Sequence, residues 1–161
     1  MIVVADTSPL NYLVLIEQIH LLAALYGRVL VPPAVVAELN ATQTPERVRY
    51  WIQRSPPWLE TRFPAHMPLD FPEILGPGER EAIALSQEIH ADALLIDDWE
   101  GRQEAARRQL TVVGTLRVLG TAAEKSLVHL PTAISRLRAT NFRASTDLLA
   151  QLLDQDRKRK S

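Results

Sequence analysis

Cysteine is absent from the 161 residues of this chain. Disulfide bonds, thiolate metal sites and cysteine nucleophiles are therefore excluded. No apolar run approaches the roughly 20 residues of a membrane-spanning helix, and the first residues lack the basic start of a secretory signal peptide. The net charge is only −1, which argues against broad electrostatic binding of nucleic acid and limits phosphate contacts to local ones. We therefore expect a soluble, cytoplasmic protein with no membrane partner.

Length and composition predict one globular domain. Apolar residues make up 47% of the chain and charged residues 23%, which is ordinary for a protein with its own core. We expect this domain to span residues 1–156, with residues 157–161 as a basic tail.

Short apolar runs alternate with amphipathic segments along the chain. Such a rhythm of strands and helices predicts a three-layer α/β/α sandwich with a mostly parallel central sheet of about five strands. The expected strands are residues 2–5, 28–31, 58–63 (an edge strand), 93–96 and 110–113. The expected helices are residues 8–16, 19–26, 44–54, 78–89, 98–109, 115–125, 131–139 and 145–155, plus one that begins at Pro32-Pro33 and carries Glu38.

Acidic residues recur where an apolar strand or helix meets a turn. Asp6 ends the run MIVVA, and Asp97-Asp98 end the run ALLI. Glu38 lies in PPAVVAEL, and Glu81 lies in the first turn of GEREAIAL. In an open parallel sheet, functional groups collect at the carboxyl ends of the strands. Carboxylates gathered there repel one another unless they share a cation, so the pattern predicts a site for a hard metal ion.

Each acidic residue also has a simpler interpretation. Asp6, Thr7 and Ser8 can form a helix-capping turn, with Ser8 as the N-cap and Pro9 at the first helical position. Glu38 can be a solvated helix residue. Glu79 and Glu81 share a first helical turn, where the helix dipole favours acids without any function. Two aspartates directly after a buried strand are harder to explain without a ligand or capping role.

Two other enzyme or binding classes fit the chain poorly. A phosphatase of the haloacid-dehalogenase type needs a second Asp two residues after the first, where this chain has Ser8. The segment Gly76-Pro77-Gly78 is too short and too rigid for a glycine-rich phosphate loop. The four histidines (His20, His66, His90 and His129) show no metal-ligand spacing.

Most of the chain resembles one family in motif order and spacing. The motifs are VVADTSPLNYL, VPPAVVAEL, LGPGEREAIALS, ADALLIDDWEGRQEA and VVGTLRVL, with a weaker match at TNFRASTDLLAQLL. Together they resemble the PIN-domain family of metal-dependent ribonucleases, especially the VapC-like toxins of toxin–antitoxin systems.

The resemblance implies a set of acidic catalytic residues: Asp6, Glu38, Glu81 and Asp98. Metal ligation by one or two ions, Mg²⁺ or Mn²⁺, is implied for Asp6, Glu81, Asp97 and Asp98. The third position in the commoner subgroup is Asp, and the last motif usually has Thr where this chain has Ile96. These departures make Glu79 and Asp97 further candidates.

Neighbouring polar residues have supporting roles in this interpretation. Thr7, Ser8 and Asn11 can orient the carboxylates or a water, and Thr115 can face the same crevice or cap its helix. Arg102 can contact RNA phosphate, or can pair with Glu100 or Glu104.

A second surface also has the composition of an RNA-binding patch. It comprises Arg47, Arg49, Arg54, Trp51 and Trp58, which an amphipathic helix docked on a partner explains equally well.

The implied activity is endoribonucleolytic hydrolysis by a toxin that pairs with a cognate antitoxin. The alternative is a catalytically inactive PIN-fold module that binds RNA or protein. The resemblance also implies a homodimer. Core packing alone can account for the feature that agrees with it, which is that five apolar residues near the acidic site exceed what two short helices need to cover one sheet face. These are Leu13, Ile16, Leu21, Leu22 and Leu25.

Overall fold

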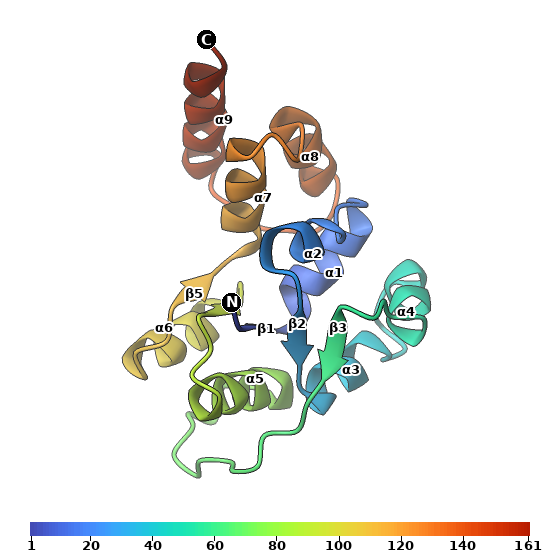
Figure 1. Cartoon of the computed structure of the whole chain (residues 1–161), viewed down its shortest axis with the longest axis vertical. Coiled ribbons are helices and arrows are strands. Elements are labelled where there is room, and N and C mark those ends of the chain that lie inside the picture. The colour runs from blue at the N-terminus through green and yellow to red at the C-terminus, as the bar shows by residue number, and fades with distance from the viewer.

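Five parallel strands form the central sheet of the computed structural model, which describes residues 1–161. Their order across the sheet is β3-β2-β1-β4-β5 (Figure 1). The strands are β1 (Val3–Ala5), β2 (Val29–Val31), β3 (Leu59–Thr61), β4 (Ala93–Leu95) and β5 (Val112–Val113). The expected α/β/α fold is confirmed, and β3 is an edge strand as predicted.

Nine helices connect and cover these strands, close to the ranges expected from the sequence. They are α1 (Thr7–Leu15), α2 (Leu21–Tyr26), α3 (Pro33–Leu39), α4 (Glu46–Gln53), α5 (Pro77–Glu88), α6 (Trp99–Arg107), α7 (Thr115–Glu124), α8 (Leu130–Arg138) and α9 (Thr146–Lys160). None of them combines the length and the apolar composition that a bilayer crossing requires.

The sheet is buried on both faces, which explains why its strands are continuous apolar runs. Side chains alternate between the two faces along a strand, so neighbours such as Val3 and Val4 belong to different cores. The larger core joins the sheet to α1, α2, α3, α4, α7, α8 and α9. The smaller core joins the other face to α5, α6 and the segment around Phe71.

The central strand β1 marks the point where the chain changes direction across the sheet. The chain passes from β1 to β2 on one side, and β4 later pairs with β1 on the other side. A crevice forms outside the carboxyl ends of the strands at such a switch point. Asp6 follows β1 there, and its backbone N–H donates to the Leu95 carbonyl oxygen at 2.8 Å.

One local expectation is wrong, and the structure bears on two others. Helix α1 begins at Thr7 with Asp6 as its N-cap residue, so Ser8 is already helical. Residues 157–160 continue α9 and form its last turn instead of a separate tail. The apolar residues that suggested a dimer surface are core residues, because Leu13, Ile16, Leu21 and Leu22 are each at most 1% exposed.

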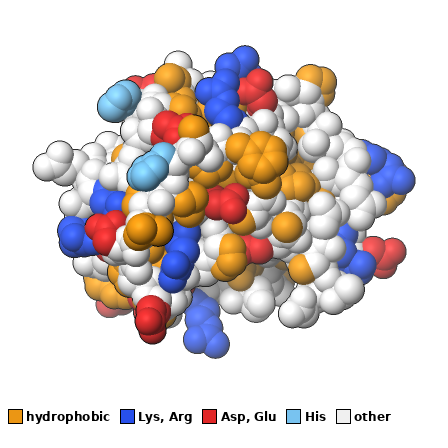
Figure 2. Space-filling view, turned by 90° about the horizontal axis from the view of Figure 1, so that it is seen from below, with side chains coloured by type: hydrophobic (Ala, Val, Ile, Leu, Met, Phe, Trp, Pro, Cys, Tyr) orange, Lys and Arg blue, Asp and Glu red, His pale blue; other side chains and the backbone are white.

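Exposed apolar side chains gather elsewhere, on the face seen from below in Figure 2, where orange side chains lie among acidic and basic ones. The long connection between β3 and α5 runs along that side of the molecule in Figure 1. It carries the exposed residues Phe63, Met67, Leu69 and Ile74.

Candidate functional site

Asp6 is a buried carboxylate with no cationic partner. Its side chain makes no helix-capping hydrogen bond, the residue is only 4% exposed, and Oδ1 has no hydrogen-bond partner. Burial raises the pKa of Asp6 from 3.8 to about 8, partly offset by the Thr7 backbone N–H. The negative charges of Glu79, Glu38 and Asp97 contribute to this raised value. The capping interpretation therefore does not describe this side chain.

Glu38 faces the same crevice from α3. The Thr7 hydroxyl donates a hydrogen bond to Glu38 Oε2, and the Gly78 backbone N–H donates to Oε1 at 3.3 Å. The carboxylate is thus fixed between α1 and α5, so the interpretation of Glu38 as a freely solvated helix residue is wrong. Thr7 thus contacts one of the carboxylates that it was expected to orient.

Glu79, in the first turn of α5, is the second carboxylate with an unsatisfied oxygen. Its Oε1 accepts the Gly76 backbone N–H at 3.1 Å, which turns the side chain back toward the start of the helix. Its Oε2 is buried without a partner. Burial, with smaller contributions from the neighbouring Asp98 and Glu38, raises the pKa of Glu79 from 4.5 to about 7, although the Gly76 backbone N–H lowers it.

Glu81 lies one half-turn further along α5 and has a different partner. Its Oε1 accepts the Ala34 backbone N–H at 2.9 Å, at the start of α3. The structure therefore brings Glu79, and not Glu81, against Asp6 and Asp98. The geometry therefore favours Glu79, the other candidate for the third position, while Glu81 satisfies a helix terminus that lacks any other side-chain cap.

Asp97 and Asp98 leave β4 in different directions. Asp97 accepts the Thr115 backbone N–H at 2.8 Å through Oδ1 and the Thr115 hydroxyl at 2.7 Å through Oδ2. Burial raises the pKa of Asp97, whereas these hydrogen bonds and the charge of Arg102 lower it. Asp98 is exposed at the N-cap of α6, makes no capping hydrogen bond, and lies against Glu79. Thr115 therefore holds Asp97 in place.

The remaining polar candidates are arranged around this cluster. Arg102 Nη1 donates to the Ile96 carbonyl oxygen at 3.2 Å and pairs with neither Glu100 nor Glu104. Ser8 lines the groove described below, and Asn11 is half-buried without a side-chain hydrogen bond.

Close packing between backbone and carboxylates shapes the site. A Cβ added to Gly101 would lie 2.6 Å from Glu79 Oε2, and one added to Gly114 would lie 2.7 Å from Arg102 Nη1 and 3.1 Å from Asp97 Oδ1. A Cβ on Gly78 would collide with Glu38. The acidic side chains therefore occupy space that only glycine leaves open.

The donor set suits a hard divalent cation, although the carboxylates do not form a ready-made cage. No three acidic side chains are arranged to hold a metal ion among themselves, so the expectation of a preformed shared-cation site is not met. Mg²⁺, however, keeps several waters and binds through only one or two carboxylates. The unsatisfied oxygens Asp6 Oδ1 and Glu79 Oε2 are buried neighbours that lack any cation. The residues of the cluster therefore fit a divalent cation such as Mg²⁺.

A groove of about 850 Å³ opens beside Asp97 and Asp98. Its walls come from α1, α6, α7, residues 141–144 and α9. It is lined by Ser8, Tyr12, Asp97, Asp98, Trp99, Arg102, Gly114, Leu116, Arg117, Asn141, Phe142, Arg143, Ala144, Leu148 and Leu152. Most of these residues were missed in the sequence, although the basic and aromatic segment Asn141-Phe142-Arg143 carried a signal for them.

The basic-aromatic patch expected on α4 is used within the molecule. Trp51 and Trp58 pack together with ring centroids 6.3 Å apart, and Arg54 covers the Tyr50 ring. Arg49 donates to the Thr44 carbonyl oxygen. This patch therefore offers fewer free groups than the groove.

One of three comparisons with known proteins gives a match, and that match agrees with this geometry. No curated protein and no solved structure matches the chain. A family model, DUF3368, described as a PIN domain, matches residues 2–158, which is nearly the whole chain and every element that builds the site. Divalent-metal nucleases are typical of this fold, and the chain belongs to the PIN-domain family.

Proposed function

We propose that this protein is a divalent-metal-dependent endoribonuclease that hydrolyses RNA phosphodiester bonds with Mg²⁺ or Mn²⁺. The observation that carries the proposal is the pair of buried, unpartnered oxygens Asp6 Oδ1 and Glu79 Oε2. None of the ion pairs in the chain involves a carboxylate of this cluster. Carboxylates left unpaired in this way are costly unless a cation joins them.

Asp6, Glu79 and Asp98 are the residues that would hold the metal, with Asp97 and Glu38 next to them. The bound ion would supply Lewis-acid polarisation of the phosphate and activation of a water. Thr7 holds Glu38, and Thr115 holds Asp97, so that these side chains keep their orientation toward the crevice. Arg102, fixed at the Ile96 carbonyl, places one positive charge beside Asp97, where it can meet a substrate phosphate.

No histidine, the usual general base for attack by a 2′-hydroxyl, lines the groove or bonds to the carboxylates, which favours attack by a metal-activated water. Hydrolysis by water leaves a 5′-phosphate and a 3′-hydroxyl. The test is to incubate RNA with the purified protein and to analyse the product ends. Activity should vanish in EDTA and return with Mg²⁺ or Mn²⁺, but poorly with Ca²⁺. Products with a 2′,3′-cyclic phosphate, or full activity in excess chelator, would refute the proposal.

The finer assignment is a cytoplasmic toxin with a cognate antitoxin, and it is supported by motif resemblance. Expression of the chain alone should arrest growth, and co-expression of a neighbouring gene should relieve the arrest. A homodimer remains part of this proposal, but the leucines that suggested it are buried in the core. Monomeric sedimentation at high micromolar concentration would remove it.

One observation favours an inactive module that binds RNA or protein. The acidic side chains do not form a ready-made metal-binding group. Calorimetric titration with Mn²⁺ separates the two functions, because the enzyme must bind the ion through Asp6 and Glu79. Absence of binding at millimolar Mn²⁺ would select the inactive module.

A further inference from the structure

The groove beside Asp97 and Asp98 is a large concave feature next to the acidic cluster. Its volume of about 850 Å³ is in the upper part of the range for ligand pockets, about 300–1,000 Å³. It begins at the acidic residues that follow β4 and continues between α1, α7 and α9. A polymer whose scissile phosphate lies at the carboxylates can therefore extend into this groove.

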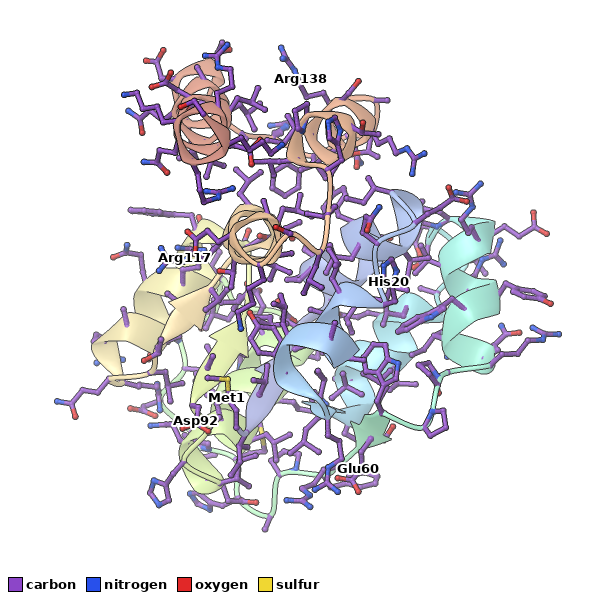
Figure 3. The ribbon with its side chains drawn as sticks, turned by 45° about the horizontal axis from the view of Figure 1, so that its top comes forward. Met1, His20, Glu60, Asp92, Arg117 and Arg138 are labelled. Carbon is purple, nitrogen blue, oxygen red and sulfur yellow. The ribbon has the colours of Figure 1, made fainter.

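The groove contains arginines that the protein does not use for its own stability. Arg117 and Arg143 are exposed and form no ion pair and no side-chain hydrogen bond within the chain. Figure 3 labels Arg117 on α7 and also Arg138, a third arginine without a partner, at the end of α8. Arg138 lines a smaller pocket that shares Phe142 and Ala144 with the groove, so two arginines with free donors, Arg117 and Arg143, line the groove itself.

An arginine on α5, beside the acidic cluster, has guanidinium donors occupied by the protein itself. Arg80, next to Glu79 on α5, donates to the carbonyl oxygens of Leu75 at 2.8 Å and Pro72 at 3.0 Å. Arg80 keeps its charge, but these hydrogen bonds occupy donors that a phosphate would need, so α7 offers more free guanidinium donors than α5.

Aromatic side chains complete the groove. Trp99 directly follows Asp98 and is 68% exposed, which is unusual for so large an apolar side chain. At the other wall, Tyr12 and Phe142 meet edge to face with ring centroids 5.0 Å apart. The Tyr12 hydroxyl donates to Asn141 Oδ1 at 2.8 Å, which fastens the segment 141–144 to α1.

We propose that this groove binds unpaired nucleotides on one side of the scissile phosphate, with phosphates at Arg117 and Arg143 and a base stacked on Trp99. Exposed aromatic faces and free arginines are the combination by which proteins hold single strands, because a base must leave its duplex to stack on a side chain. This inference rests on the proposed function for the position of the scissile phosphate. Binding itself requires no catalysis and is tested without it.

The experiment measures binding of a fluorescent oligoribonucleotide by anisotropy in EDTA, where hydrolysis is blocked. The same sequence is used as a single strand and as a perfect duplex. The single strand should bind more tightly, and should quench tryptophan fluorescence in the wild type but much less in Trp99→Phe. Trp99→Ala should weaken single-strand binding by roughly tenfold, whereas Trp99→Phe keeps a stacking face and should stay within about threefold of the wild type.

The salt dependence tests the arginines separately. Each phosphate contact to a single strand contributes about −0.7 to the slope of log K against log salt. Arg117→Ala and Arg143→Ala should each make the slope less negative by about 0.7. Arg28→Ala is the matched control, because it removes the same charge from another exposed arginine. Arg28 pairs with Glu60 and directly precedes β2, so it lies at the amino ends of the strands, away from the groove.

Three results would overturn the proposal: equal affinity for duplex and single strand, equal slopes for the Arg28 and Arg117 variants, or Trp99 shielded by a copurifying protein and not by RNA. The two proposals fail in different ways. If the wild type does not cleave RNA in Mg²⁺ but still binds single strands, the proposed nuclease activity is wrong and the proposed binding groove stands. If the Trp99 and arginine variants cleave and bind RNA like the wild type, only the proposed binding groove is wrong.

Discussion

Two groups of buried carboxylates in this molecule have opposite surroundings. On α6, Glu104 is 5% exposed and accepts hydrogen bonds from Arg107 at 2.6 and 3.0 Å and from Arg108 at 2.6 Å. On α9, Asp156 pairs with Arg159 at 2.7 Å and Lys160 at 2.9 Å. Asp6 and the Oε2 atom of the half-buried Glu79 are also shielded from water but have no cation at all.

The pKa values follow this difference. The Arg107 hydrogen bonds hold the pKa of Glu104 below its usual range, while burial raises the pKa of Asp6 to about 8 and of Glu79 to about 7. Paired carboxylates stabilise the fold of this chain, whereas unpaired ones destabilise it until a ligand arrives. Burial alone does not distinguish structural acids from functional ones, but the presence or absence of a cation does.

The largest expected effect comes from Asp6→Asn. Removing this carboxylate should lower ribonuclease activity by at least about 100-fold, because a metal ligand is lost. Stability should stay equal or rise, because the variant relieves repulsion among buried charges, a stability–activity trade-off. Product formation in Mg²⁺ measures the loss of activity, and thermal unfolding in EDTA measures the change in stability. A clear loss of melting temperature would instead assign Asp6 a structural role.

A matched pair of variants on α5 tests the assignment of the third acidic position. Glu79→Gln should reduce activity by roughly 100-fold and leave the fold intact. Glu81→Gln should retain activity per folded molecule and cost at most about 1–2 kcal/mol of stability, since Glu81 acts at the start of α3. The comparison needs kcat on both proteins at saturating Mg²⁺. Reversed activity losses would return the site to Glu81.

The paired acids should behave in the opposite sense. Glu104→Gln leaves Arg108, only 10% exposed, without its main partner, and should cost about 2–3 kcal/mol of unfolding free energy. Its activity per folded molecule should equal that of the wild type. Urea denaturation monitored by circular dichroism gives the free energy. A stability gain from this substitution would break the contrast between the two groups.

The smallest effect is the dependence of stability on pH. Asp6 and Glu79 have pKa values in the folded protein above their ordinary values of 3.8 and 4.5. The folded state therefore binds more protons than the unfolded state between pH 4 and 8, so these groups lose stabilising effect as pH rises through about 7 and 8. In EDTA, the melting temperature should fall by several degrees over this window.

Mg²⁺ should oppose that fall, because metal binding requires ionised carboxylates and displaces their protons. Calorimetry at pH 7 in buffers of different ionisation enthalpy should show proton release on binding. Asp6→Asn provides the control, with a flatter pH profile in EDTA. A melting temperature that rises with pH in the wild type would contradict the assignment of unpaired acids.

The fold was predictable from the sequence because its strands are apolar on both faces, so that runs such as Val3–Ala5 and Ala93–Leu95 stand out. The acidic ends of these strands followed directly. The choice between Glu79 and Glu81 did not, because both share one turn and only their partners, Gly76 in the same helix and Ala34 in another, separate them.

The groove was hidden for a similar reason. Its residues come from α1, α6, α7, α9 and the segment 141–144, which approach one another only after folding. The exact start of helix α1 was also not predictable from the sequence. The helix begins at Thr7, so Asp6 occupies the N-cap position that was expected of Ser8.

The glycines at the site have a consequence for how this protein can evolve. Gly78, Gly101 and Gly114, half of the six glycines in the chain, each lie against a side chain of the acidic site. Every other amino acid carries a Cβ, so no amino-acid substitution at these positions is neutral for the side chains of the site. Gly120, by contrast, has its nearest neighbour at 3.7 Å from an added Cβ and has room for alanine. In a mutational scan, three residues with no chemistry of their own should thus be as intolerant as the acids they shelter.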